Sequence, residues 1–158
     1  MIKIQGSNLS DKIVKEIGKF TILWAEFEKE YCNNNCNDSL LVANKDNFIV
    51  DEDIITKFNT NLHGRAEAFN EDIEIYTNYN LIPNNAHRPR DKYIKIMRDF
   101  INLDKLVKSD WICGALLCIH RIRNNLLHGL KILSELNYQV KLFKSMNKVL
   151  ENIRRKSK

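Results

Sequence analysis

The sequence predicts an all-α fold, an antiparallel bundle of about five helices in a single domain spanning residues 1–158. Apolar residues recur at steps of three and four along several long segments, which is the spacing of one face of an α-helix. The 158 residues include only two prolines and five glycines, whereas an all-β fold needs frequent turn residues. No internal repeat or low-complexity run divides the chain.

The composition is that of an ordinary globular protein, with 44% hydrophobic and 28% charged residues. No apolar run approaches the roughly 20 residues that a membrane span needs, and the N-terminus lacks the apolar core of a signal peptide. We therefore expect a cytoplasmic protein with no membrane partner. The formal net charge of +5 is compatible with a nucleic-acid partner, although a mild positive excess alone is weak evidence for one.

The first predicted helix follows residues 1–8, which we expect to form a loose lead-in. Ser10 or Asp11 can cap its N-terminus. Its apolar stripe covers about five turns and indicates a core position; the stripe consists of Ile13, Ile17, Phe20, Trp24, Phe27 and Tyr31. Residues 33–50 then form a polar connection, in which residues 40–42 are expected to be strand-like.

The second predicted helix begins at Asp51 or Asp53. Its stripe is Ile55, Phe58, Leu62, Ala66, Phe69, Ile73 and Tyr76. Because two consecutive long helices carry matching stripes, we expect them to pack antiparallel. A turn-rich linker at residues 79–88 precedes Pro89, which suits the first position of a third helix.

The third helix is the most basic segment of the chain, and its apolar side is Tyr93, Ile96, Met97, Phe100 and Leu103. Its cationic residues are Arg88, Arg90, Lys92, Lys95 and Arg98. They form either a solvated face or one edge of an RNA groove, since such grooves follow the nucleic-acid backbone with lysines and arginines.

A fourth helix, capped by Ser109 or Asp110, is apolar on every side over residues 111–119 and is therefore central. It contains Cys113 and Cys118, which we interpret as small core residues. Neither this pair nor Cys32 and Cys36 has the two-residue gap of a zinc knuckle, so we expect no metal site and no cofactor.

The last predicted helix starts at Ser134 or Asn137. Its apolar side consists of Val140, Phe143, Met146, Val149, Leu150 and Ile153.

Charge interrupts the apolar pattern at the end of the fourth helix, in the sequence Arg121-Ile-Arg123-Asn124-Asn125-Leu-Leu-His128-Gly129. Arg123 shares the helix face of Leu116 and Ile119. Burying an unpaired arginine costs several kcal/mol, so Arg123 needs a partner. That partner is either a carboxylate such as Glu26 or Glu67, or a phosphate, whose oxygens suit the guanidinium fork.

His128 lies about 140° around an ideal helix from Arg123. Gly129 favours a left-handed cap, so the helix is expected to end near Leu127 or His128 and to leave the imidazole at a terminus. Asn124 can hold the side chain of Arg123 or of His128 by hydrogen bonds. An arginine and a histidine without a carboxylate pair suit metal-independent RNA cleavage. The histidine would move protons at the 2′-OH and the leaving oxygen, and the arginine would stabilise charge at phosphorus.

Arg123-Asn124-Asn125-Leu126-Leu127-His128 resembles the Arg-Asn-x-x-x-His signature of HEPN domains, a family of helical nucleotide-binding proteins. The layout is also similar, with long helices first, the motif at the end of a buried helix, and a closing amphipathic helix. The resemblance implies a metal-independent endoribonuclease that works as a homodimer, often as a toxin or phage-defence effector with an antitoxin protein. Arg123 and His128 would be the catalytic pair and Asn124 their polar support.

Many relatives that pair with a nucleotidyltransferase antitoxin carry a tyrosine two residues after the histidine, where this chain has Leu130. Such an antitoxin is therefore doubtful as its partner. Further candidates for RNA contact are Arg121, His120, Arg88 and Arg90, although Arg121 points away from Arg123 toward solvent or a partner, and His120 also fits an interior histidine. The alternative function is a catalytically silent HEPN-like module that binds nucleic acid, nucleotide or a protein.

Overall fold

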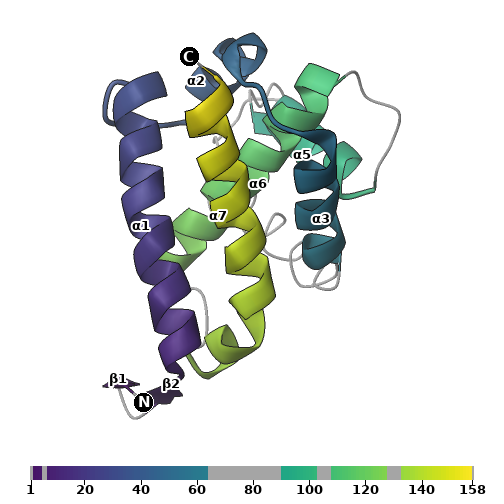
Figure 1. Cartoon of the computed structure of the whole chain (residues 1–158). Helices are drawn as coiled ribbons and strands as arrows, with labels where there is room; N and C mark the ends of the chain where they lie inside the picture. The colour runs from purple at the N-terminus through teal and green to yellow at the C-terminus, as the bar shows by residue number, and fades with distance from the viewer. Residues whose placement is uncertain (1, 5–6, 64–89, 103–107, 128–132, 158) are drawn as a thin grey trace, which may run out of the picture.

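The computed structural model describes residues 2–4, 7–63, 90–102, 108–127 and 133–157. These residues form an all-α helical bundle, which confirms the predicted fold class (Figure 1). The α-helices are α1 (Asp11–Tyr31), α2 (Asp38–Ala43), α3 (Glu52–His63), α5 (Arg90–Ile101), α6 (Lys108–Leu127) and α7 (Val140–Lys156). The shorter elements are the strands β1 (Ile2–Ile4) and β2 (Ser7–Leu9) and the 3-10 helices η1 (Lys45–Asn47) and η2 (Leu133–Gln139).

Helix α1 begins where the sequence predicts. The Ser10 hydroxyl accepts a hydrogen bond from the Ile13 amide at 3.3 Å, which caps the helix. Most of the predicted apolar stripe is buried, while Ile17 and Tyr31 are partly exposed. The aromatic rings of this stripe pack in sequence along the helix, from Phe20 to Trp24 and on to Phe27.

Helices α1 and α7 lie side by side and run in the same direction (Figure 1). Three hydrogen bonds fix this parallel register. Near the start of both helices the Ser10 amide donates to Asn137 Oδ1 at 2.8 Å. Further along, Asn147 Nδ2 donates to the Glu16 carbonyl at 3.1 Å, and at the far end the Tyr31 hydroxyl donates to the Ser157 carbonyl at 2.6 Å.

Helix α3 packs on the other side of α7 and runs antiparallel to it. The Asp51 amide donates to Asn152 Oδ1 at 2.8 Å, and Asn61 Nδ2 donates to the Lys141 carbonyl at 3.4 Å. Helix α7 therefore lies between α1 and α3 (Figure 1). The first two long helices flank α7 instead of forming the direct antiparallel pair that their stripes suggested.

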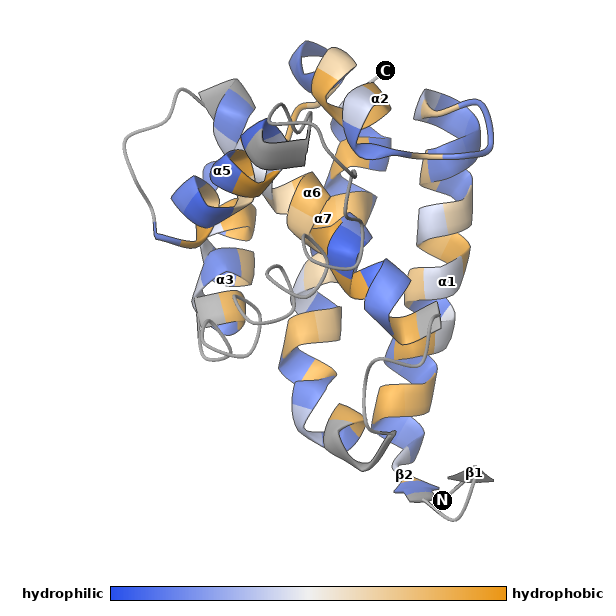
Figure 2. Ribbon diagram, turned by 180° about the vertical axis from the view of Figure 1, so that it is seen from behind, coloured by the Kyte–Doolittle hydropathy of each residue, from blue (hydrophilic) through white to orange (hydrophobic). Residues whose placement is uncertain are grey.

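Helices α5 and α6 lie behind α7. Every residue from Ile112 to Ile122 is buried, so the apolar part of α6 is central, as predicted (Figure 2). The two helices approach closely at Gly114, where a Cβ atom would lie 2.6 Å from Phe100 Cβ and 3.2 Å from the Ile96 carbonyl oxygen. A glycine is needed there because any side chain would collide with α5.

Several predicted boundaries are wrong. The strands β1 and β2 pair antiparallel, so the described residues before α1 are not a loose lead-in. Residues 40–42 are helical, because Asn37 Oδ1 accepts from the Leu40 amide at 2.8 Å and caps α2. Helix α6 begins at Lys108, before the predicted caps, although it ends at Leu127 as expected.

The last helix also begins later than predicted, at Val140, after the 3-10 helix η2. The Asn137 side chain does not cap α7. It accepts from the Ser10 amide and donates to the Asn8 carbonyl, so it joins η2 to the start of α1. The later part of the second predicted stripe (Ala66, Phe69, Ile73 and Tyr76), the linker at 79–88, Pro89 and Leu103 lie outside the described residues.

Candidate functional site

Arg123 lies in the last two turns of α6, where burial of the helix becomes incomplete. Its side chain is 32% exposed, although the preceding residues from Ile112 to Ile122 are buried. Arg123 Nη1 donates to Asn124 Oδ1 at 3.3 Å, which is the hydrogen bond expected between these two side chains. Arg123 Nη2 lies 3.7 Å from Glu28 Oε1 on α1. The acidic neighbour is therefore Glu28. The expected Glu26 pairs with Arg154 instead, and the other expected residue, Glu67, lies outside the described residues.

Glu28 is held in place by the turn that follows α1. Its other carboxylate oxygen, Oε2, accepts a hydrogen bond from the Cys36 amide at 2.9 Å. Asn33 and Asn34 have positive φ angles of 52° and 74°, which reverse the chain after α1. Asparagine tolerates this left-handed region better than most residues. The reversal brings Cys36 back beside Cys32 and places the Cys36 amide against Glu28.

Cys32 and Cys36 form a disulfide, with their Cα atoms 4.9 Å apart. The sequence reasoning missed this bond, and the run of three asparagines between the cysteines is the signal that could have indicated a tight reversal. Disulfides persist mainly in oxidising compartments, so the cytoplasmic location stays a prediction.

Cys113 and Cys118 are buried core residues, as expected. Burial raises the pKa of Cys113 to about 11 and raises the pKa of Cys118 well above its usual range. Both thiols therefore stay protonated at neutral pH, which makes them poor nucleophiles and poor metal ligands. Within the described part of the chain, no three histidine, cysteine or acidic side chains converge as a metal site.

His120 is 9% exposed, which agrees with its interpretation as an interior histidine and not as an RNA contact. Its Nδ1 lies 3.2 Å from Asp38 Oδ1, and its ring stacks on Trp24 with a centroid distance of 5.7 Å. Arg121 is 7% exposed, so the first of its two expected contacts, with solvent, is wrong, while contact with a partner stays a prediction. The cavity beside these two residues is about 10 Å³, which is room for about one water molecule.

The remaining candidates cannot be placed against Arg123. His128 and Arg88 lie outside the described residues. Arg90 is the first residue of α5, but its side chain lies outside the described part of the structure. The described geometry thus brings together Arg123, Asn124 and Glu28.

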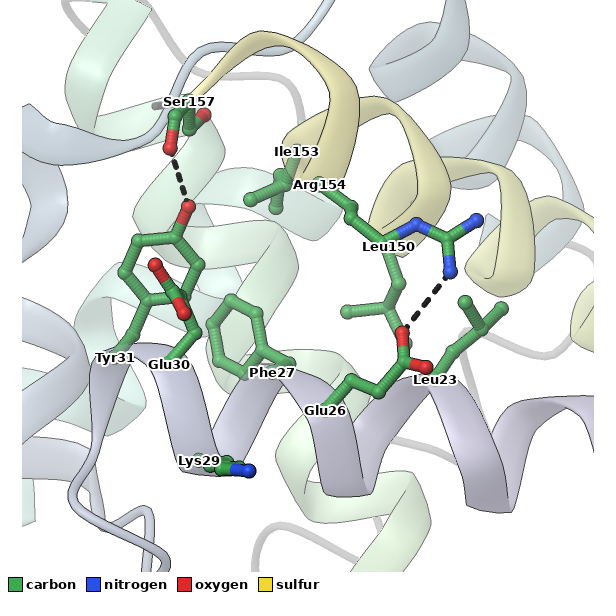
Figure 3. A pocket seen from close by; sticks show the side chains of 10 residues that line it. All are labelled: Leu23, Glu26, Phe27, Lys29, Glu30, Tyr31, Leu150, Ile153, Arg154 and Ser157. Atoms are coloured by element: carbon green, nitrogen blue, oxygen red, sulfur yellow. Dashed lines mark hydrogen bonds and ion pairs between the residues drawn. The ribbon is translucent and has the colours of Figure 1, made fainter.

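A larger cavity of about 360 Å³ lies between the C-terminal halves of α1 and α7 (Figure 3). Apolar side chains from both helices line it, namely Leu23, Phe27, Leu150 and Ile153. At its rim Arg154 Nη1 donates to Glu26 Oε2 at 3.0 Å, and Tyr31 is bonded to Ser157. Arg154 and Glu26 pair with each other, whereas Lys29 and Glu30 also line the cavity and make no described ion pair. All four charged residues are exposed, so the cavity holds none of the buried charged groups that are typical of a catalytic site.

No known protein-family model matches the sequence, and neither a curated protein nor a solved structure matches it. The HEPN resemblance therefore rests on the residues from Arg123 to His128 and on the order of the helices. Among the described helices, none is both long and apolar enough to cross a membrane.

Proposed function

We propose that the chain is a metal-independent endoribonuclease of the HEPN type, in which Arg123 and His128 act on RNA at a homodimer interface. A cytoplasmic toxin or phage-defence effector, controlled by an antitoxin protein, is the setting that this activity would fit. The observation that carries the proposal is the position of Arg123, a partly exposed cation at the end of a buried helix.

The contacts of Arg123 support a role in binding phosphate. Its only described polar neighbours are the Asn124 amide oxygen at 3.3 Å and the Glu28 carboxylate at 3.7 Å, both long for strong hydrogen bonds. An arginine that served only to stabilise the fold would be expected to form shorter, bidentate contacts with its carboxylate. The guanidinium therefore retains donors for the oxygens of a phosphate.

In the proposed reaction, His128 removes the proton of a ribose 2′-OH, whose oxygen attacks the adjacent phosphorus. The bond from phosphorus to the 5′-oxygen breaks, and that oxygen takes up a proton from His128 of the second copy of the chain. The products are a 2′,3′-cyclic phosphate and a 5′-hydroxyl. Arg123 stabilises the negative charge that builds on the phosphate oxygens during the attack.

A dimer supplies the second acid–base group. One arginine and one histidine make a thin site, whereas a two-fold axis near the end of α6 brings two copies of each residue together. This arrangement requires the end of α6 to face its own copy.

Glu28 favours the alternative function, a catalytically silent module that binds nucleic acid, nucleotide or a protein. A carboxylate beside Arg123 offsets the positive charge that a phosphate needs. In that case the Arg123–Glu28 contact is part of the fold, and the end of α6 serves as a binding surface without chemistry.

The test compares purified wild type with Arg123→Ala and His128→Ala on total RNA in excess EDTA. The ribonuclease proposal expects cleavage by wild type alone. Equal cleavage by all three proteins indicates a contaminating nuclease and overturns the assignment. Binding without cleavage, weakening steeply with salt, supports the silent module instead.

A further inference from the structure

The outer side of α7 carries three lysines that the proposed catalytic residues do not involve. Lys141, Lys144 and Lys148 are exposed and recur at steps of three and four, so they form one row along the helix. At 1.5 Å per residue this row is about 10 Å long. We call it the α7 lysine row.

The lysine row has no acidic partner within the described part of the chain, unlike the cations that follow it on the same helix. Arg154 pairs with Glu26 and Lys156 pairs with Asp51, whereas the three lysines of the row make no described ion pair. Like charges at these spacings destabilise a helix by about 0.2–0.5 kcal/mol per pair. The fold gains nothing from this repulsion, which suggests that the row serves a ligand.

The neighbouring helices extend the positive charge on both sides of the row. On α1, Lys12 and Lys15 lie seven and four residues before Lys19 and share its side of the helix. Lys19 in turn pairs with Glu151 of α7 at 2.7 Å, which shows that this side of α1 borders the outer side of α7. On α3, the exposed Lys57 lies one turn before Asn61, whose side chain contacts the Lys141 carbonyl.

Tyr138 adds an exposed aromatic ring at the start of the row, three residues before Lys141. Its side chain is 91% exposed, although Leu136 and Gln139 on either side of it are buried. The adjacent Asn137 is bonded to Ser10 and Asn8, so this turn is fixed against the start of α1. The ring is therefore presented to solvent from an anchored turn, between the lysines of α1 and those of α7.

We propose that the α7 lysine row, with Tyr138 at its start, binds single-stranded RNA. A positive track that follows the phosphates and an aromatic ring on which a base stacks are the two components of single-strand binding surfaces. The bases of a duplex are already stacked on each other, so an exposed ring favours unpaired RNA. The choice of RNA among polyanions rests on the proposed function, whereas the charge and the exposed ring do not.

An anionic membrane is the competing partner for a lysine-rich face. Stable binding to a membrane surface also needs apolar side chains that insert between the lipids. The large exposed apolar side chains among the described residues are Tyr138, Ile22 and Ile49. Ile22 lies three residues after Lys19 on the same side of α1, whereas Ile49 lies at the far end of the bundle, beside Ser157. Two such side chains near the row are few for insertion into a bilayer. The surface therefore suits a nucleic acid better than a bilayer.

The experiment measures the affinity of a fluorescein-labelled, 2′-O-methylated single-stranded RNA by anisotropy at several salt concentrations. This probe cannot be cut, because it lacks the free 2′-OH. Lys144→Gln/Lys148→Gln is expected to reduce the slope of log K against log salt by about 1.4, since each phosphate contact contributes about 0.7 on a single strand. Tyr138→Ala is expected to weaken binding about tenfold and to leave the slope unchanged, because stacking releases no counterions.

Lys29→Gln/Lys45→Gln is the charge control. It removes two positive charges outside the row, near the end of α1 and at the start of η1, and Lys45→Gln also breaks the pair of Lys45 with Asp110 at 2.8 Å. Equal slopes for this control and the row variant would overturn the proposal, as would an unchanged affinity for Tyr138→Ala. Binding of wild type to phosphatidylserine vesicles but not to the probe would overturn it in favour of a membrane.

Cleavage of unmodified RNA in EDTA is followed in parallel. Probe binding that depends on the row, without any cleavage, supports this surface and contradicts the proposed ribonuclease. Cleavage by wild type with no effect of the row or of Tyr138 on probe binding contradicts this surface and leaves the ribonuclease in place.

Discussion

The Arg123 guanidinium lies 3.7 Å from the carboxylate of Glu28, which at the same time accepts a hydrogen bond from the Cys36 amide at 2.9 Å. One acidic residue of α1 thus joins the proposed catalytic arginine to the turn closed by the Cys32–Cys36 disulfide. This contact decides how much positive charge Arg123 can offer to a phosphate.

Glu28→Gln removes the negative charge beside Arg123 and keeps an oxygen for the Cys36 amide. Because a partly exposed ion pair is worth at most about 1 kcal/mol, we expect a two- to fivefold gain in RNA affinity. Glu26→Gln is the control, since it removes the same charge half a turn away. A loss of cleavage by Glu28→Gln with unchanged RNA affinity would contradict this interpretation and indicate that Glu28 takes part in the reaction.

Gly114 and Gly18 make a matched pair for substitution by alanine. Both lie within helices, where alanine is favoured over glycine by about 1 kcal/mol. A Cβ at Gly18 meets nothing within 4 Å, so Gly18→Ala should raise the free energy of unfolding by up to about 1 kcal/mol. A Cβ at Gly114 collides with Phe100, so Gly114→Ala should lower it by about 1–2 kcal/mol. Urea unfolding measures both, and an equal gain for the two variants would contradict the close approach of α5 and α6.

The disulfide predicts the number of free thiols. Of the four cysteines, two are bonded to each other, so titration of the denatured, unreduced protein should find two thiols. Cys32→Ser/Cys36→Ser should lower the free energy of unfolding by about 2 kcal/mol, the loop-closure value for so short a loop. Four reactive thiols in the unreduced protein would show that the bond is absent.

Asp51 predicts a pH dependence of stability. Its hydrogen bond with Lys156 holds the pKa of the carboxyl below its usual value near 3.8. A lowered pKa in the folded state contributes stability above the usual pKa, and this contribution is lost as pH falls through the lowered one. Asp51→Asn should therefore be less stable than wild type at pH 6 to 7, and the difference should shrink as the pH falls below 3.8 and through the lowered pKa. Thermal unfolding across this pH range measures the effect, and a constant difference would contradict it.

The sequence predicts the helices of this fold well, because their apolar stripes are long. It predicts the start of α1 from Ser10 and the end of α6 from the glycine that follows, and both agree with the structure. Which helices touch is harder to infer, because a stripe shows which side of a helix is buried but not what covers it. Helix α7 buries residues toward both α1 and α3, and this arrangement separates the two helices that were expected to pair.

For the candidate site, too, the sequence predicts positions along a helix better than contacts between helices. Helical geometry predicts that Arg123 shares the buried face of Leu116 and Ile119, but its side chain is 32% exposed because it lies near the end of α6. The expected hydrogen bond with Asn124 is present. The identity of the acidic neighbour depends on how α1 is rotated against α6, and this rotation places Glu28 at Arg123 while Glu26 pairs with Arg154. The Cys32–Cys36 bond depends on two left-handed asparagines, a backbone choice that periodicity does not encode.

The most direct test of the central claim is the 2′-OH dependence of cleavage by a single purified preparation. We expect wild type to cut a single-stranded RNA in EDTA, to leave 2′,3′-cyclic phosphate ends, and to spare the same strand when all its 2′ oxygens are methylated. Arg123→Ala should slow cleavage of the unmodified strand by about 100-fold or more, the usual effect of losing one group that stabilises transition-state charge. Cleavage of the methylated strand, or an Arg123→Ala rate equal to that of wild type, would contradict the account.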